Sequence, residues 1–192
     1  MDGAGKVKDV ILIGGSAGSL PIVMRLLTGM PPDFSASVII ILHRLKNAAS
    51  DMDQLLSRIA GIPVEEPDDK TRMERGRVYL APANYHLLAD EEDTISLDYS
   101  EPELHSRPSI NITFASFAAM YGSRVTALLL SGSNSDGAAG LKAVLEHNGS
   151  AVIQDPLDCE YPVMPEYAAV VNPGVTALTV DEIDRLFKSI VL

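Results

Sequence analysis

Three residue types that together perform acyl transfer occur where apolar segments of the chain end. Ser16 lies in the glycine-rich stretch after Val10–Ile13, His43 directly follows SVIIIL, and Asp136 comes six residues after VTALLL. A hydroxyl, an imidazole and a carboxylate are the groups with which hydrolases activate a serine nucleophile. If the apolar segments are parallel strands of one sheet, their carboxyl ends share one edge, and the three side chains can converge there.

Each of the three residues also has a structural explanation. A serine in a glycine-rich turn before a helix is often a turn or cap residue, although Gly14–Gly18 (GGSAG) matches the G-x-S-x-G pattern of a strained elbow that exposes a serine. His43 fits a hydrogen-bonded core histidine, and Asp136 fits an N-cap of a helix that starts near Gly137. The order Ser, His, Asp along the chain differs from the Ser, Asp, His order of common α/β-hydrolases. Catalysis is favoured because three separate strand ends supply complementary groups.

The elements that position these residues alternate along the chain between apolar runs and helical patterns. Strands are predicted at Asp9–Gly14, Ser37–Leu42, Arg77–Ala81, Val125–Ser131, Ala151–Gln154 and Val175–Leu178. Helices are predicted over Leu20–Leu27, Met52–Ile59, Ile110–Tyr121 and Leu141–Leu145, and from Thr179, at capping-box spacing from Glu182, to the C-terminus. Strands that are apolar throughout indicate a sheet covered on both faces. The expected fold is therefore α/β, a three-layer α/β/α, doubly wound and mostly parallel sheet.

One stretch interrupts this alternation. His86–Ala89 and Thr94–Asp98 flank the acidic sequence DEED and predict an antiparallel hairpin at one edge of the sheet. Tyr99–Pro108 is the longest irregular segment, and EEPDD at Glu65–Asp69 is predicted to be a solvated loop. Gly149 occupies a position that favours a left-handed helix cap.

Composition excludes several classes of function. The 192 residues carry a net charge of −11 and no basic cluster, which argues against nucleic-acid binding. No apolar run approaches the roughly 20 residues of a membrane span, and the N-terminus has no signal-peptide hydrophobic region, so a cytoplasmic location is expected. The single cysteine, Cys159, excludes an internal disulfide and an all-cysteine zinc site, and a plain reduced thiol is expected. The spacing of His86 and His105 relative to His43 is not that of a metal site.

Several motifs occur together in register: VILIGGSAGS, VIIILHR, VYLAPANYHL, RPSINITFASFA, LLLSGSNSDGAAGL and CEYPVMPEYAA. With these motifs, the chain from Asp9 to Leu192 resembles the catalytic domain of CheB-type chemotaxis protein-glutamate methylesterases. The resemblance implies one catalytic domain over 1–192. Family members commonly carry an N-terminal receiver domain, and none is expected here because the first strand is predicted to begin near Asp9. The resemblance also implies a triad of Ser16, His43 and Asp136, and no cofactor or metal.

The resemblance further implies a reaction and a partner. The substrate would be a glutamate γ-methyl ester on the cytoplasmic helices of methyl-accepting chemotaxis receptors, hydrolysed to glutamate and methanol, with glutamine deamidation as a related activity. The sequence departs from the family at Ala17–Ser19 and at Ser131–Ser133, where Ser133 replaces a methionine. These departures leave a second hypothesis, a catalytically decayed receptor-binding module of the same fold.

Other features have weaker functional interpretations. The glycine turn lacks both the G-x-G-x-x-G pattern and a P-loop lysine, so a nucleotide site is disfavoured. Arg107 has two alternatives, docking an acidic receptor helix or bonding to a loop carbonyl. His147 is expected near a helix C-terminus, as a partner of the helix dipole on the surface.

Overall fold

The computed structural model describes residues 9–44 and 51–192. Its main sheet contains β1 (Val10–Gly15), β2 (Ser37–Leu42), β3 (Val64–Glu65), β5 (Arg77–Leu80), β8 (Val125–Leu129), β9 (Ser150–Gln154) and β10 (Thr176–Leu178). These strands run in the order β10-β9-β8-β1-β2-β5-β3, and all neighbours are parallel. The predicted parallel sheet is therefore confirmed.

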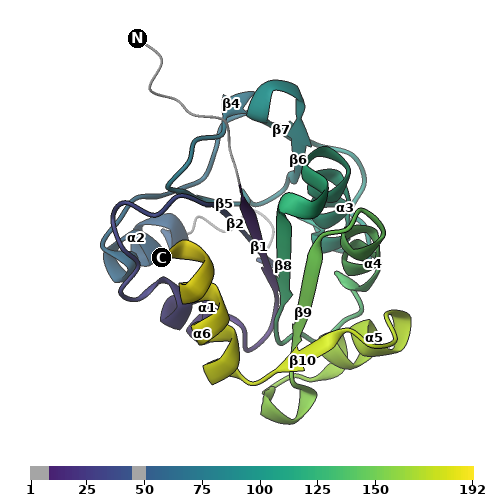
Figure 1. The fold of residues 1–192 in the computed structure, drawn as a ribbon. Coiled ribbons are helices and arrows are strands. Elements are labelled where there is room, and N and C mark those ends of the chain that lie inside the picture. Colours follow the sequence, from purple (N-terminus) through teal and green to yellow (C-terminus); the bar gives the residue numbers. More distant parts are fainter. Residues whose placement is uncertain (1–8, 45–50) are drawn as a thin grey trace.

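Helices cover both faces of this sheet (Figure 1). One layer contains α1 (Leu20–Leu27), α2 (Met52–Ala60) and α6 (Val180–Val191), and the other contains α3 (Ile110–Tyr121), α4 (Ala138–Glu146) and α5 (Val163–Val171). Residues of β1 alternate between the two cores: Val10 and Leu12 pack towards α3, and Ile11 and Ile13 pack towards α1. Since all four are fully buried, each contributes roughly 1.5–3 kcal/mol of hydrophobic stabilisation. This two-sided burial explains why the strand is apolar at every position.

The predicted hairpin forms from β6 (His86–Asp90) and β7 (Thr94–Asp98), joined by the 3₁₀ turn η1 (Glu91–Asp93). The structure adds a third strand, β4 (Thr71–Arg72), so the hairpin belongs to a small antiparallel sheet of its own. Ser116 of α3 binds this sheet, since its Oγ accepts from Ala89 N at 2.9 Å and donates to Ala89 O at 3.2 Å. The small sheet therefore packs on α3 rather than pairing with the main sheet.

Some elements were not predicted. The two-residue strands β3 and β4 are too short to show an apolar periodicity. The second residue of β3, Glu65, is the first residue of the stretch that was predicted to be a solvated loop. Helix α5 was missed because Pro165 lies inside it, but Pro165 falls in the first turn, where a missing N–H costs nothing. Two other turns, η2 (Gly122–Arg124) and η3 (Pro156–Asp158), complete the fold.

The helix caps give one confirmation and one correction. Thr179 and Glu182 form the predicted capping box at the start of α6. The left-handed residue after α4 is Asn148, with φ of 63°, so the prediction for Gly149 was wrong. Gly149 is required for packing instead, because a Cβ there would lie 2.7 Å from Val144 Cγ1. Asparagine tolerates the left-handed conformation better than most residues, which explains the exchange of roles.

The order of the strands identifies the edge where a site is expected. The chain forms β1 and β2, then β3 at the far edge and β5 between β2 and β3. It then returns to the other side of β1 and continues through β8 and β9 to β10. In such sheets, sites form beyond the carboxyl ends of the strands where the order reverses. Here that point lies at the ends of β1, β2 and β8. None of the helices within 9–44 and 51–192 has the length and apolar character to span a bilayer.

Candidate active site

Ser16 directly follows β1, in a turn whose glycines are required for close packing. A Cβ on Gly14 would lie 2.6 Å from Ile110 Cγ2, and one on Gly15 would lie 2.5 Å from Ser19 Oγ. The left-handed residue of the turn is Gly18, with φ of 77°, and Ser16 is not among the described residues with positive φ. The expectation of a strained serine elbow was therefore wrong, because Gly18 accommodates the reversal instead.

The turn after β1 is hydrogen-bonded to the turn after β8. Ser16 N donates to Ser131 O at 3.0 Å, and Ser131 Oγ donates to Ala17 O at 2.9 Å. Ser131 is fully buried, and its Oγ also accepts from Tyr161 N at 3.0 Å. A hydroxyl at position 131 thus links three segments. The family that the sequence resembles usually has threonine at position 131, and Ser131 keeps this link because serine and threonine carry the same donor and acceptor.

His43 follows β2 and extends the pairing of β1 and β2 by one residue, because its backbone N donates to Gly15 O at 3.2 Å. Its side chain is 11% exposed, and Nε2 lies 2.8 Å from Asp136 Oδ2. Asp136 accepts hydrogen bonds and can donate none when ionised, so Nε2 carries the proton. The remaining ring nitrogen, Nδ1, then has a free lone pair in the neutral imidazole. It lies 3.3 Å from Ser106 Oγ and 3.4 Å from Asn134 Nδ2.

Asp136 is fully buried, and donors surround its carboxylate. Oδ2 accepts from His43 Nε2 at 2.8 Å and Ile110 N at 2.7 Å, and Oδ1 accepts from Ser109 Oγ at 3.1 Å, Asn111 N at 2.9 Å and Gly137 N at 2.9 Å. Burial opposes ionisation of this carboxyl. The hydrogen bonds from His43 and from the backbone of α3 outweigh that effect and hold the pKa of Asp136 below its ordinary value. The carboxylate is therefore charged at neutral pH.

Asp136 caps a helix other than the one predicted. Gly137 is the N-cap residue of α4 and has no side chain with which to cap that helix. Asp136 instead binds the first N–H groups of α3, which begins at Ile110. The partial positive charge at the start of a helix stabilises an anion there. The predicted local N-cap was wrong because Gly137 is the N-cap residue of α4, and Asp136 binds the start of α3 while keeping one bond from Gly137 N.

Sequence reasoning missed several residues that position this carboxylate. Ser109 both donates to Asp136 and caps α3, its Oγ accepting from Ile112 N at 3.3 Å. Asn111 Oδ1 accepts from Gly137 N and Gly140 N, each at 2.9 Å, and so fixes the start of α4. The motif RPSINITFASFA contains both residues, but only the fold shows that they face the loop after β8. Ser106 lies in Tyr99–Pro108, the segment that the sequence identified only as irregular.

The three predicted residues come from adjacent strand ends. His43 and Asp136 are in direct contact, although β2 and β8 lie on opposite sides of β1. The loop after β8 must therefore cross the carboxyl end of β1, where Ser16 lies. Among the described residues, the Ser16 hydroxyl donates to no acceptor, and no hydrogen bond joins it to His43. Catalytic hydrogen bonds are often absent until substrate binds.

The remaining candidates have structural roles. Arg107 Nη1 donates to Tyr99 O at 2.9 Å and Ser100 O at 2.6 Å, and its guanidinium lies 3.9 Å from the Tyr99 ring centroid. Of its two alternatives, the bond to loop carbonyls is thus the one observed. His86 is fully buried, with Nδ1 accepting from Ser109 N at 3.1 Å and Nε2 facing Glu101 O at 3.1 Å.

Two more predictions concern His147 and Cys159. His147 is the C-cap residue of α4, and its Nδ1 lies 2.8 Å from Ala143 O, as expected for a residue at a helix C-terminus. Burial, reinforced by the charges of Asp158 and Asp155, raises the pKa of the Cys159 thiol to about 12. A thiol that remains protonated at neutral pH is a poor nucleophile.

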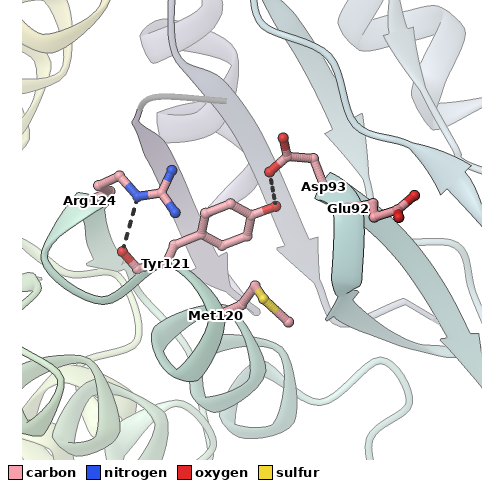
Figure 2. Close-up of a pocket in the computed structure, with 5 residues that line it drawn as sticks. All are labelled: Glu92, Asp93, Met120, Tyr121 and Arg124. Atoms are coloured by element: carbon pink, nitrogen blue, oxygen red, sulfur yellow. Dashed lines mark hydrogen bonds between the residues drawn. The ribbon is translucent and has the colours of Figure 1, made fainter. Parts of the chain in front are cut away.

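A separate cavity of about 470 Å³ lies near the start of β8, away from the strand ends that carry Ser16 and His43 (Figure 2). It is lined by Glu92, Asp93, Met120, Tyr121 and Arg124. Tyr121 Oη donates to Asp93 Oδ1 at 3.1 Å, and the Arg124 guanidinium lies 5.0 Å from the Tyr121 ring centroid. These contacts join η1 to the end of α3.

Comparisons with known proteins identify a family and individual relatives that are similar to this chain. The sequence profile described as CheB methylesterase matches residues 11–187. A Leptospira interrogans protein, provisionally named protein-glutamate methylesterase/protein-glutamine glutaminase, is 34% identical over 179 residues, which are 93% of each chain. A Methanosarcina acetivorans protein-glutamate methylesterase/protein-glutamine glutaminase is 32% identical over 165 residues, covering 82% of this chain and 46% of that protein.

A solved structure has the same fold as this chain. The crystal structure of the Thermotoga maritima CheB methylesterase catalytic domain matches with a TM-score of 0.87. It covers 95% of this chain and 98% of that domain, at 24% sequence identity. The chain therefore belongs to the CheB methylesterase family and is a hydrolase.

Proposed function

We propose that this protein hydrolyses glutamate γ-methyl esters on the cytoplasmic helices of chemotaxis receptors, with Ser16, His43 and Asp136 as its catalytic triad. The observation that carries the proposal is the 2.8 Å hydrogen bond between His43 Nε2 and Asp136 Oδ2. Asp136 lies in the loop after β8, which crosses the carboxyl end of β1 just before Ser16. The names of the Leptospira and Methanosarcina relatives support the substrate class. Since this substrate lies on the cytoplasmic helices of receptors, the protein would act in the cytoplasm.

In the proposed first half-reaction, Ser16 Oγ attacks the ester carbonyl carbon while His43 Nδ1 takes the hydroxyl proton. Asp136 stays ionised and stabilises the imidazolium through Nε2–H. The tetrahedral intermediate then breaks its bond to the methoxy oxygen, which takes the proton from Nδ1 and leaves as methanol. In the second half-reaction, water gives a proton to Nδ1 and attacks the acyl-enzyme. The bond between Ser16 Oγ and the carbonyl carbon then breaks, Oγ takes the proton from Nδ1, and glutamate and free Ser16 are released.

Backbone donors for the tetrahedral oxyanion are available in the two turns around Ser16. The N–H of Ser16 donates to Ser131 O, and that of Gly132 donates to Tyr161 O. Within the described chain, the N–H groups of Ala17, Gly18 and Ser133 donate to no protein acceptor. We therefore assign the oxyanion site to the N–H groups of Ala17, Gly18 and Ser133. Because a backbone N–H persists at Ser133, the replacement of the family's methionine does not remove a donor.

Exposed tyrosines on both sides of the site support docking of a receptor helix. Tyr99, 67% exposed, lies under Arg107, the residue after Ser106. Tyr161, 42% exposed, lies on the other side, close to Gly18. Tyrosine offers a large apolar area with a polar tip, which suits a protein interface. Such contacts would offset the repulsion between a chain of net charge −11 and an acidic receptor surface.

The same chemistry extends to glutamine deamidation. A glutamine side chain presents the same carbonyl carbon, with an amide nitrogen in place of the methoxy oxygen. His43 Nδ1 would protonate that nitrogen, and ammonia would leave instead of methanol. The double name of both relatives supports this second activity.

Methanol release from a methylated receptor tests the proposal. Ser16→Ala and His43→Ala should each lower the rate by roughly 10⁴-fold or more, because both remove a member of a unit that acts together. Ser135→Ala is the matched control, since within the described residues the Ser135 hydroxyl makes no hydrogen bond. A Ser16→Ala variant that keeps more than about a tenth of the activity would refute the role of Ser16. A folded wild-type protein that releases no methanol, and that a serine-directed fluorophosphonate does not label, would identify the binding-module alternative.

A further inference from the structure

The side chain of Asn134 faces the nitrogen that must accept the serine proton. Its Nδ2 lies 3.4 Å from His43 Nδ1, whereas the other ring nitrogen is committed to Asp136. Asn134 is half-buried, in the loop between β8 and α4. Among the described residues, the Asn134 amide and the Ser106 hydroxyl, whose Oγ lies 3.3 Å away, are the side-chain donors within hydrogen-bond distance of that nitrogen.

Backbone contacts fix the orientation of this amide. Asn134 Oδ1 accepts a hydrogen bond from Asp136 N at 3.1 Å. A backbone N–H can only donate, so the amide oxygen must face it, and the NH₂ group must face away from it, towards His43. The same loop residue therefore holds the Asp136 backbone with its oxygen and presents two N–H donors on the opposite side. Only one of these hydrogens can point at Nδ1.

The position of Asn134 relative to Ser16 follows from the topology. His43 belongs to β2, Asn134 follows β8, and β1 lies between those two strands. A contact between His43 and Asn134 therefore spans the carboxyl end of β1, which is where Ser16 begins its turn. An ester carbonyl attacked by Ser16 would develop its negative charge in this space.

The partner of the Asn134 amide must change during the reaction. In the resting site, Nδ1 has a lone pair that can accept a hydrogen bond from Nδ2. Once Nδ1 has taken the serine proton, it becomes a donor, and two donors cannot bind each other. At that same moment the carbonyl oxygen becomes an oxyanion and requires donors. An amide that loses its acceptor when the oxyanion forms favours the transition state over the ground state, which is what accelerates a reaction.

We propose that Asn134 is a catalytic residue that donates a side-chain hydrogen bond to the oxyanion formed on attack by Ser16. This inference rests on the proposed function and adds a side-chain donor to its backbone oxyanion site. The resting contact with Nδ1 holds the amide in place until substrate arrives. On attack, Nδ2 releases His43 and donates to the oxyanion, while Oδ1 keeps its hydrogen bond from Asp136 N.

Two substitutions separate this role from a structural one. Asn134→Asp keeps an oxygen that can accept from Asp136 N but has no N–H, and its charge repels an oxyanion. Asn134→Ala loses both the oxygen and the donor. Loss of one oxyanion donor lowers kcat by roughly 10²–10³-fold, with KM changed by less than about threefold. We therefore expect both variants to lose kcat in methanol release, and Asn134→Asp to lose more than Asn134→Ala.

The opposite order would overturn the inference. If Asn134 only supports the loop, Asn134→Asp retains most of kcat and Asn134→Ala loses it. Retention of kcat by both variants would also refute the role. The rate at which a fluorophosphonate labels Ser16 gives a second readout that needs no receptor, and the same ranking is expected there. Thermal unfolding of each variant checks that the fold is intact, and Ser135→Ala is the control from the same loop.

The outcomes also separate this inference from the proposed function. Equal labelling of the wild type and both Asn134 variants at Ser16 would refute only the inference. A wild-type protein that neither releases methanol nor is labelled at Ser16 would refute the function and the inference together.

Discussion

Two carboxylates with a titratable hydrogen-bond partner lie in separate parts of the molecule. Asp136 accepts from His43 Nε2 at 2.8 Å beyond the carboxyl ends of the strands, and Asp93 accepts from Tyr121 Oη at 3.1 Å beside the cavity of Figure 2. Both pairs join segments that are distant in sequence. Only the first pair supports a chemical function.

The two pairs differ in whether the partner of the carboxylate has a second atom that can accept a proton. Histidine has a second nitrogen, so His43 can bind Asp136 through Nε2 and still accept a proton at Nδ1. Tyrosine has a single hydroxyl, which Asp93 already occupies. Burial, together with the charge of Asp93, raises the pKa of Tyr121 well above its ordinary value, so the phenol keeps its proton. A carboxylate pair can move a proton only when its partner has a second working atom, and the pair of Asp93 and Tyr121 therefore serves the fold alone.

The largest expected contrast is between Asp136→Asn and Asp93→Asn. Asp136→Asn should lower methanol release by about 10⁴-fold, because an amide no longer holds the His43 tautomer or stabilises the imidazolium. Asp93→Asn should leave the rate within about twofold, because that carboxylate has no part in proton transfer. Steady-state kinetics of the two variants measure the contrast. Equal losses in both would show that the comparison is wrong.

Asp136→Asn should also lower the free energy of unfolding, by an amount that depends on pH. The folded-state pKa of Asp136 is depressed, so its contribution is fully present above the unfolded pKa of about 3.9 and is lost as pH falls through the folded pKa. Replacing the carboxylate leaves several buried donors without an anion, at a cost of roughly 2–3 kcal/mol at neutral pH. Urea unfolding at pH 7 and at pH 3 measures the difference between wild type and Asp136→Asn. That difference should shrink on acidification, and a constant difference would contradict the ionised carboxylate.

Two helix caps give the next contrast. Ser109→Ala removes the cap of α3 and a donor to Asp136, whereas Thr179→Ala removes only the capping box of α6. Each should cost about 1–2 kcal/mol of unfolding free energy. Only Ser109→Ala should also lower kcat, since only its hydroxyl positions the triad. Chemical denaturation and methanol release on both variants test this, and a loss of kcat in Thr179→Ala would argue against it.

The smallest expected effect is that of Tyr121→Phe. The substitution keeps the ring that Phe117 and Arg124 contact and removes only the hydrogen bond to Asp93. We expect a loss of about 1 kcal/mol of unfolding free energy and unchanged kinetics. Thermal unfolding and methanol release check the two parts separately. A measurable fall in kcat would mean that the cavity in Figure 2 is connected to the active site.

Sequence patterns predicted most of the fold because strand burial and helix periodicity leave a local signal. Ser37–Leu42 was predicted to the residue, since a run of buried apolar residues ends at a histidine. The short strands at Val64 and Thr71 left no such signal. Thr94–Asp98 was also predicted to the residue, and the boundaries of the remaining predicted strands differ by one or two residues.

The site was predicted less completely. His43 and Asp136 were chosen from their places at strand ends, and the fold brings them into contact. The residues that hold Asp136 come from the start of α3, 25 to 27 positions earlier in the chain. Sequence alone could not show which helix N-terminus would face the carboxylate, because that depends on how α3 packs against the loop after β8. For the same reason, the choice of Nε2 as the partner of Asp136 required coordinates.

The binding of Asp136 to the first amides of α3 has a consequence for native-state hydrogen exchange. The N–H groups of Ile110 and Asn111 can exchange only when they separate from the carboxylate. Opening of the catalytic loop and fraying of this helix end are therefore one event. Slow amide exchange at these two positions would report, residue by residue, how firmly the proposed triad is assembled before any substrate arrives.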